Sequence, residues 1–163
     1  AEAPVALCEV QGYAYEAAGK AADLLDAFGR PGADEWRSWA QRLSARFREA
    51  FWVDGNDRYP AIALDAHKRR VDTVSSNIGH LLSTGILSPD ECALVATRLA
   101  QPDMDSGWGL RTMTATSRRY NPLSYHGGSV WPHDTAITIL GLAATGHDDV
   151  AASLATGDQQ RVV

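Results

Sequence analysis

The chain has 163 residues, of which 45% are hydrophobic, and its 15 Lys and Arg against 20 Asp and Glu give a formal net charge of −5. This length suits one compact domain with its own core, and the hydrophobic fraction argues against disorder. The acidic balance argues against nucleic-acid binding, since the longest basic run is Lys68, Arg69 and Arg70. No apolar run approaches the roughly 18 residues of a membrane span, so we expect no membrane partner either.

Apolar residues recur at helical spacing through most of the chain. The pattern predicts a first helix over residues 5–28, stopped by the GRPG sequence at 29–32. The second helix carries one apolar stripe, which we interpret as a packing surface and which comprises Trp36, Trp39, Ala40, Leu43, Phe47, Ala50 and Phe51. We then expect a short extended segment at 59–64 and a third helix at 76–84.

The next two segments are predicted to be the start of a fourth helix and a long loop that follows this helix. Ser88, Pro89 and Glu91 have the spacing of a capping box, which predicts the start of a fourth helix. Residues 101–128 are rich in Gly, Pro, Ser, Thr and aromatic side chains. A loop of this length inside a compact domain is usually functional.

The last part of the chain returns to helical patterning. Residues 130–144 are apolar almost all round, which predicts a buried helix, and a short helix is expected at 148–154. Residues 157–163 have the composition of a frayed tail. The whole pattern predicts a single all-α domain over residues 1–163, built from about six helices in stacked hairpins with long aromatic and Gly-rich loops on one rim.

The two cysteines, Cys8 and Cys92, each fall in an apolar helical pattern. We interpret them as buried free thiols rather than a disulfide, which fits a reducing, cytoplasmic compartment. No cluster of Cys and His has zinc-site spacing. His126 and His133 lack the spacing and acidic support of a metal pair, so we expect no metal and no cofactor.

Polar and aromatic side chains gather within thirty residues of loop and helix start. They are Asp105, Trp108, Arg111, Tyr120, Tyr125, His126, Trp131, His133 and Asp134. A sugar ring stacks on an aromatic face, and its hydroxyls bond to Asp, Arg, His or Asn at the edge. In the alternative interpretation these aromatic residues seal the loop against the core.

Two carboxylates are candidates for catalysis, and each has a plainer interpretation. If Pro132 opens a helix, Asp134 lies in the first turn, where it stabilises the positive end of the helix dipole, or it faces a ligand. Glu9 lies one turn from Tyr13 and is either an acid with a raised pKa or a hydrogen-bonding group. His80 also has two interpretations: it is either a core histidine whose hydrogen bonds are satisfied or a residue of the site.

Four motifs occur in order: EVQGY at 9–13, SNIGHLL at 76–82, SGWGLRT at 106–112, and YNP at 120–122 followed by SYHGGSVWPHD at 124–134. Together they resemble the bacterial amylo-α-1,6-glucosidase, or glycogen-debranching-related, family. The resemblance covers nearly the whole chain. That family is similar to the inverting α-glucosidases built on an (α/α)6 barrel, in which six helical hairpins form two concentric rings around a sugar-binding funnel.

The resemblance also implies which residues touch substrate. It places some on the inner helices and others on the rim of the funnel. We therefore expect substrate to be bound by Gln11, Asn77, His80, Trp108, Arg111, Tyr125, His126, Trp131 and Asp134.

Family members are several times longer than this chain and carry two further motifs. The Asp of a GWKDS motif resembles the general acid, and the Glu of an LPELF motif resembles the general base; neither motif occurs here. About six helices make about half of a twelve-helix toroid. We therefore expect an inactive mid-barrel fragment, whose exposed apolar helix faces bind the missing barrel segments or a second copy.

The leading interpretation is a fragment of a glycoside hydrolase that acts on α-glucans such as glycogen, supplying part of the sugar-binding wall. Two alternatives remain open. One is a non-catalytic helical module that binds carbohydrate or another protein. The other is a different (α/α)6 hydrolase of mannosyl or trehalose type, because a fold does not determine the sugar.

Overall fold

The computed structural model describes residues 1–55 and 57–156. The helices of this part are α1 (Cys8–Ala27), α2 (Ala33–Phe51), the 3-10 helix η1 (Ser76–Leu81), α3 (Pro89–Leu99), α4 (Pro132–Ala144) and α5 (Asp148–Thr156). The short strands are β1 (Ala6–Leu7), β2 (Trp52–Val53), β3 (Tyr59–Pro60), β4 (Ala63–Leu64) and β5 (Arg70–Val71). About half of the chain is therefore helical.

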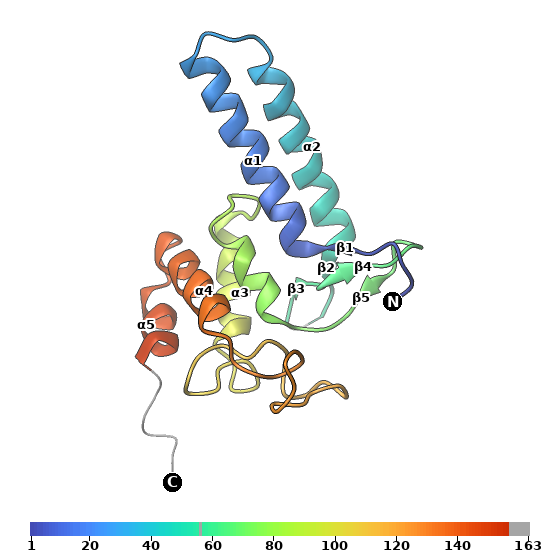
Figure 1. Ribbon diagram of the computed structural model, residues 1–163, viewed down its shortest axis with the longest axis vertical. Coiled ribbons are helices and arrows are strands. Elements are labelled where there is room, and N and C mark those ends of the chain that lie inside the picture. The colour runs from blue at the N-terminus through green and yellow to red at the C-terminus, as the bar shows by residue number, and fades with distance from the viewer. Residues whose placement is uncertain (56, 157–163) are drawn as a thin grey trace.

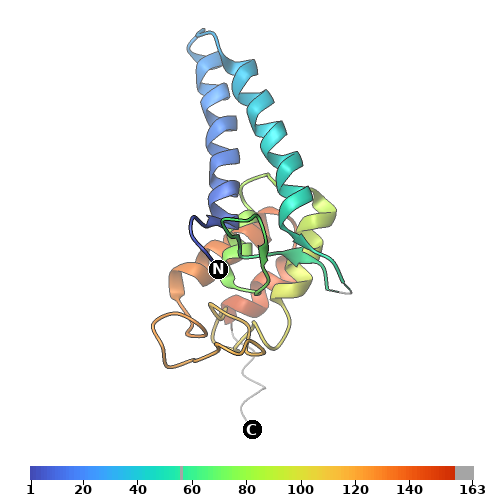
Figure 2. The same ribbon diagram turned by 90° about the vertical axis from the view of Figure 1, so that its right-hand side faces the viewer.

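Helices α1 and α2 form a long antiparallel hairpin whose tip extends away from the rest of the described chain (Figures 1 and 2). Phe47 and Phe51, near the base of the hairpin, are buried and stacked. Trp36 and Trp39, nearer the tip, are 46% and 39% exposed. The predicted packing stripe on α2 is therefore only partly covered in its first half, where Ala40 is buried against α1 but the two tryptophans extend past the body of the domain.

The 3-10 helix η1 lies between α1 and α4 and also contacts α3. Two glycines permit the close approach. A Cβ at Gly12 of α1 would lie 2.8 Å from Cδ2 of Leu81, and a Cβ at Gly79 would lie 2.9 Å from Cγ2 of Thr138 on α4. Such distances are too short for any side chain, so these glycines allow the helices that carry the site to pack closely. The helix predicted over 76–84 ends earlier, at residue 81, and is of the 3-10 type.

The predicted capping box is present at the start of α3. The amide of Glu91 donates to Oγ of Ser88, and the amide of Ser88 donates to the Glu91 carboxylate.

The prediction of two free, buried thiols is also confirmed, since Cys8 and Cys92 are unpaired and almost fully buried. Both belong to the hydrophobic core, which is built from all of the helices that surround η1.

Two other expectations are corrected. Helix α1 begins at residue 8 rather than 5, because residues 6–7 pair with β4 as an edge strand. Helix α4 is not buried all round: Leu142 is fully buried, but Leu140 is 69% exposed. One side of α4 packs on η1 and α5, while the opposite side is uncovered in the described chain. The expected extended segment at 59–64 is present as β3 and β4.

The strands are short and form two antiparallel sheets, ordered β1–β4–β5 and β2–β3. The long segment between α3 and α4 holds neither a helix nor a paired strand longer than an isolated bridge. It folds into loops at the end of the molecule opposite the hairpin tip (Figure 1). The short helix expected at 148–154 is α5, and the expected frayed tail at 157–163 lies outside the described residues. None of the described helices is long and apolar enough to cross a membrane.

Candidate functional site

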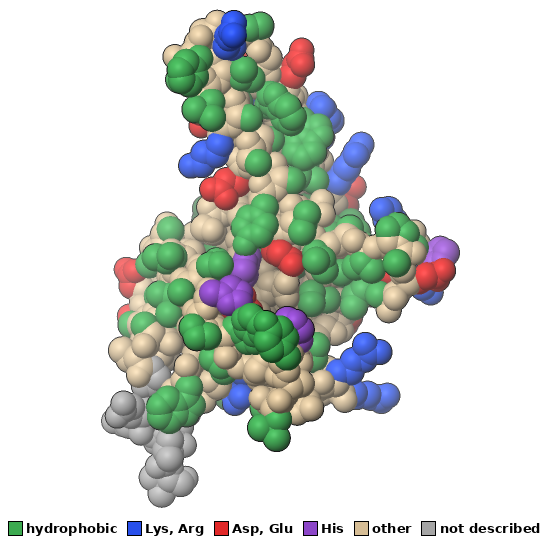
Figure 3. All heavy atoms as spheres, in the orientation of Figure 1, with side chains coloured by type: hydrophobic (Ala, Val, Ile, Leu, Met, Phe, Trp, Pro, Cys, Tyr) green, Lys and Arg blue, Asp and Glu red, His purple; other side chains and the backbone are tan. Residues whose placement is uncertain are grey.

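A cavity of about 350 Å³ opens where η1, the start of α4 and the long loops meet. We call it the inner cavity, and its lining residues are Ile62, Ser76, Asn77, Thr112, Met113, His126, Gly127, Trp131, His133 and Asp134. Its size lies at the small end of the roughly 300–1,000 Å³ range of ligand pockets. In the space-filling view, histidine side chains gather around a hydrophobic patch near the middle of one face (Figure 3).

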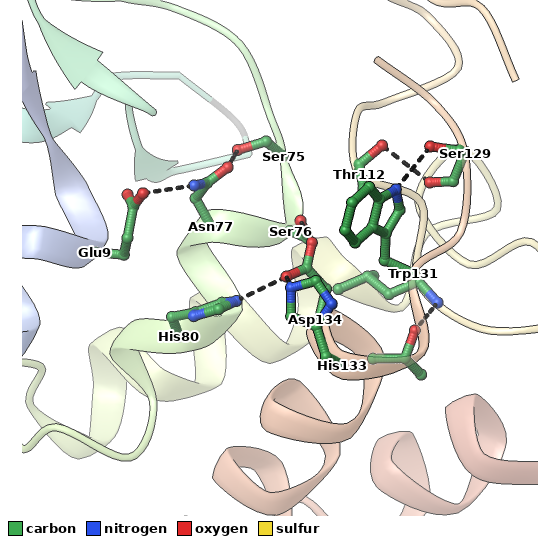
Figure 4. A network of polar contacts seen from close by, with 12 residues as sticks. Glu9, Ser75, Ser76, Asn77, His80, Thr112, Ser129, Trp131, His133 and Asp134 are labelled. Atoms are coloured by element: carbon green, nitrogen blue, oxygen red, sulfur yellow. Dashed lines mark hydrogen bonds and ion pairs between the residues drawn. The ribbon is translucent and has the colours of Figure 1, made fainter. Parts of the chain in front are cut away.

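Asp134 is the acidic residue of this wall. It lies in the first turn of α4, directly after Pro132 at the helix start, so the helix dipole favours its negative charge. The hydroxyl of Ser76 donates to Oδ2 at 2.7 Å. Nε2 of His80 lies 3.2 Å from Oδ1, and Nε2 of His133 lies 3.1 Å from the same oxygen (Figure 4). The predicted role of Asp134 at the positive end of the helix dipole and a role facing a ligand are therefore compatible in this carboxylate.

His80 is held on its other side by Tyr13. The Tyr13 hydroxyl lies 2.5 Å from Nδ1 of His80, and the two rings meet edge to face. Burial raises the pKa of Tyr13, and the charges of Glu9 and Asp134 raise it further. A neutral phenol donates its proton to Nδ1, which leaves Nε2 of His80 as the donor toward Asp134. The chain of contacts thus runs from α1 through η1 to α4.

Glu9 sits beside the cavity rather than in its wall. Nδ2 of Asn77 donates to Oε1 of Glu9 at 2.7 Å, and the Ser75 hydroxyl donates to Oδ1 of Asn77 at 2.8 Å (Figure 4). Burial raises the pKa of the neighbouring Cys8 thiol, and the charge of Glu9 adds to this effect. Glu9 therefore acts in this structure as the group that orients Asn77.

The aromatic part of the wall is Trp131. Its indole Nε1 donates to the carbonyl of Tyr125 at 2.9 Å and lies 3.2 Å from the Ser129 hydroxyl. The His126 ring stacks on it with a centroid distance of 5.4 Å and an interplanar angle of 11°. The indole is thus fixed in place by hydrogen bonds and by ring contacts before any ligand arrives.

The structure brings together five of the residues expected to bind substrate. Asn77, His126, Trp131 and Asp134 line the inner cavity, and His80 contacts Asp134 from behind. Sequence reasoning missed Ser76 and Thr112 as lining residues. Each stands at one end of a motif that was already singled out, so the signal for them was membership in those motifs.

Four other expected residues lie elsewhere. Gln11 donates to the carbonyl of Leu7 and lines a separate cavity beside Phe47. Trp108 is 78% exposed and Tyr125 is 72% exposed. Arg111 reaches the hydroxyl of Tyr120 at 3.0 Å rather than the inner cavity. Their roles in substrate binding stay predictions.

Comparison with known proteins gives a family and a fold. The model of the family described as mannosylglycerate hydrolase MGH1-like glycoside hydrolase domain matches residues 2–160. A search of the curated proteins found no match.

Solved structures are similar to the chain over most of its length. One is the GH63 mannosylglycerate hydrolase from Thermus thermophilus, with a TM-score of 0.76 and 18% identity over 94% of this chain and 36% of that one. Another is neutral trehalase from Saccharomyces cerevisiae, with a TM-score of 0.74 and 19% identity over 93% of this chain and 30% of that one. The chain thus spans about a third of the length of these structures.

These matches confirm the predicted fold class, because the chain matches part of the (α/α)6 barrel of glycosidases. They support a family of (α/α)6 glycoside hydrolases, and this support is not specific to the amylo-α-1,6-glucosidase type.

Proposed function

This chain belongs to the mannosylglycerate hydrolase MGH1-like glycoside hydrolase family, and we propose that it supplies part of the sugar-binding wall of an enzyme that hydrolyses α-glucans. The inner cavity would bind one hexose unit. Remaining barrel segments, packed on the apolar helix faces, would be its structural partners. A cytoplasmic location is proposed from the two free thiols alone.

The observation that carries the proposal is the placement of Asp134 next to Trp131. Asp134 has both carboxylate oxygens oriented by donors from η1, and Trp131 is fixed by its own hydrogen bonds. A carboxylate accepts hydrogen bonds from two adjacent sugar hydroxyls, and such charge-assisted bonds are stronger than neutral ones. An aromatic surface beside it packs against the C–H groups of the ring.

The proposed chemistry is inverting hydrolysis. It needs a general acid and a general base about 6.5–9.5 Å apart, so that a water molecule fits between the base and the anomeric carbon. Asp134 is the acidic side chain that lines the inner cavity within the described residues, and Glu9 is engaged with Asn77. We therefore propose that the acid and base belong to other segments of the enzyme, and that this chain binds and orients the sugar.

The sugar and the linkage are the finer part of the proposal. The four motifs support an α-1,6-glucosidase that acts on glycogen-like branches. The family description and the structural similarity to a mannosylglycerate hydrolase favour a second candidate, in which the substrate is a mannosyl or trehalose-type glycoside.

Calorimetry with the 163-residue chain separates these possibilities. Titration with maltose, isomaltose, trehalose and mannosylglycerate should give weak binding of an α-glucan disaccharide that Asp134→Ala abolishes. Release of glucose should not be detectable. Preferential binding of mannosylglycerate or trehalose would favour the second candidate. Robust turnover that is lost in Asp134→Ala or Glu9→Ala would instead place a catalytic residue in this chain.

Absence of binding to every sugar would refute the proposed function. It would favour the alternative of a protein-interaction module, which a defined protein partner would then support.

A further inference from the structure

A second cavity adjoins the inner one and shares Trp131 with it. This outer cavity is a shallow, open depression of about 620 Å³, lined by Pro122, Leu123, Ser124, Tyr125, Ser129, Val130, Trp131 and Pro132. All of these residues come from the end of the long loop and the start of α4. The outer cavity is therefore built from the same segment that forms the aromatic part of the proposed sugar site.

The outer cavity has an exposed aromatic surface. Tyr125 is 72% exposed, and Leu123 beside it is 95% exposed. The Tyr125 ring meets Trp131 edge to face, with centroids 4.5 Å apart and an interplanar angle of 80°. One side of the Tyr125 ring is thus supported by the indole, while most of the side chain is open to solvent. Exposed apolar side chains grouped beside a binding site mark a surface that a ligand covers.

Hydrogen bonds hold the backbone beneath this surface in place. The Ser124 hydroxyl donates to the carbonyl of Asn121 at 2.8 Å, and the Ser129 hydroxyl donates to the carbonyl of Tyr125 at 2.9 Å. Trp131 Nε1 donates to the same carbonyl. The Tyr125 ring is therefore presented by a turn whose main chain is anchored independently of that ring.

We propose that the outer cavity is a second glycosyl subsite, which binds the next hexose unit of the same chain by stacking on Tyr125. This inference rests on the proposed function, since the first unit occupies the inner cavity. Its consequence is a substrate class: an oligosaccharide of at least two hexose units, rather than a hexose joined to a small aglycone. A hexopyranose has a face of C–H groups that packs on an aromatic ring, and its hydroxyls can reach Ser124 and Ser129 at the edge.

The test compares ligand lengths with calorimetry on the whole 163-residue chain. The ligands are glucose, maltose and maltotriose, and the readout is the ratio of their dissociation constants. We expect maltose to bind about tenfold more tightly than glucose, a gain of the size that one aromatic stacking contact provides. Tyr125→Ala should remove this gain, whereas Tyr125→Phe, which keeps the ring, should preserve it.

A matched control is Phe28→Ala. Phe28 is 77% exposed on the α1–α2 hairpin, far from the loops, so its loss should leave the ratio unchanged. Equal affinities for glucose and maltose, or a gain that survives in Tyr125→Ala, would overturn the second subsite while maltose binding still supported the proposed function. Binding of none of the three ligands would refute both.

Discussion

Gly79 on η1 and Thr138 on α4 touch so closely that a Cβ on the glycine would lie 2.9 Å from Cγ2 of the threonine. Thr138 is fully buried, and its hydroxyl has no hydrogen-bond partner among the described residues. The contact fixes the separation of the two helices that carry His80 and Asp134. The geometry of the inner cavity thus depends on a glycine that takes no part in binding.

Gly79→Ala should destabilise the fold by about 1–3 kcal/mol, the usual cost of forcing extra atoms into a packed interior. Urea denaturation measures this as a lower free energy of unfolding. In a Thr138→Ala background the same substitution should cost less, because the atoms that it meets have been removed. Equal costs in both backgrounds would show that η1 and α4 do not meet at this point.

Asp134 and His80 should contribute unequally to sugar affinity. Asp134→Asn removes a charged acceptor and should weaken binding about 10- to 100-fold, the range for hydrogen bonds to charged groups. His80→Ala should weaken it less, because His80 only orients the carboxylate, and His80→Gln should restore part of the loss. Calorimetry with maltose ranks these variants. A larger effect for His80→Ala than for Asp134→Asn would contradict the assigned roles.

The stability of the fold should depend on pH through the carboxyl group of Asp65. Hydrogen bonds from the Arg69 guanidinium lower the pKa of this carboxyl from its usual 3.8 to about 2, and the amides of Arg69 and His67 add to the effect. Because the folded state binds this proton less readily, the contribution is present above about pH 4 and is lost as the pH falls toward 2.

Asp65→Asn should therefore lower the urea midpoint at pH 6 and should flatten its decline between about pH 4 and pH 2. The matched control is Asp34→Asn, since the side chain of Asp34 is fully exposed. Parallel pH profiles for wild type and Asp65→Asn would argue against the lowered pKa.

Removal of the capping box at Ser88 should lower the stability of the fold without changing the candidate site. Ser88→Ala leaves the amide of Glu91 without its acceptor at the start of α3 and should cost about 1 kcal/mol. Ser38→Ala, at an exposed position inside α2, is the control for serine removal. Thermal unfolding followed by circular dichroism measures both, and equal melting temperatures for the two variants would disprove the capping role.

Helical periodicity predicted most of the fold, and its failures have physical causes. The apolar composition of α4 indicated burial on all sides, yet composition does not reveal which neighbours are present, and Leu140 faces solvent. The stripe on α2 was interpreted as one surface, although Trp36 lies beyond the body of the domain. Two-residue strands such as β1 shifted the start of α1, because pairing with β4 outweighed helix propensity there.

The sequence motifs predicted those site residues that lie within them. They predicted less well which way a side chain on a helix faces. Asn77, Trp131 and Asp134 converge because η1 and α4 pack together through Gly79. Gln11 is two residues from Glu9, and residues two apart on a helix face different directions, so only one of them reaches Asn77. Which side of a helix meets its neighbour is set by tertiary packing.

The most direct measurement is a titration of the chain with maltose, followed through the indole N–H signals of its tryptophans by NMR. Trp131→Phe assigns the signal of Trp131, and Trp36 and Trp39 on the distant hairpin serve as internal controls. A sugar bound in the inner cavity should shift the Trp131 signal in a saturable way and leave the hairpin signals in place. Shifts confined to Trp36 and Trp39, or no shift at any concentration, would contradict a sugar-binding wall around Asp134.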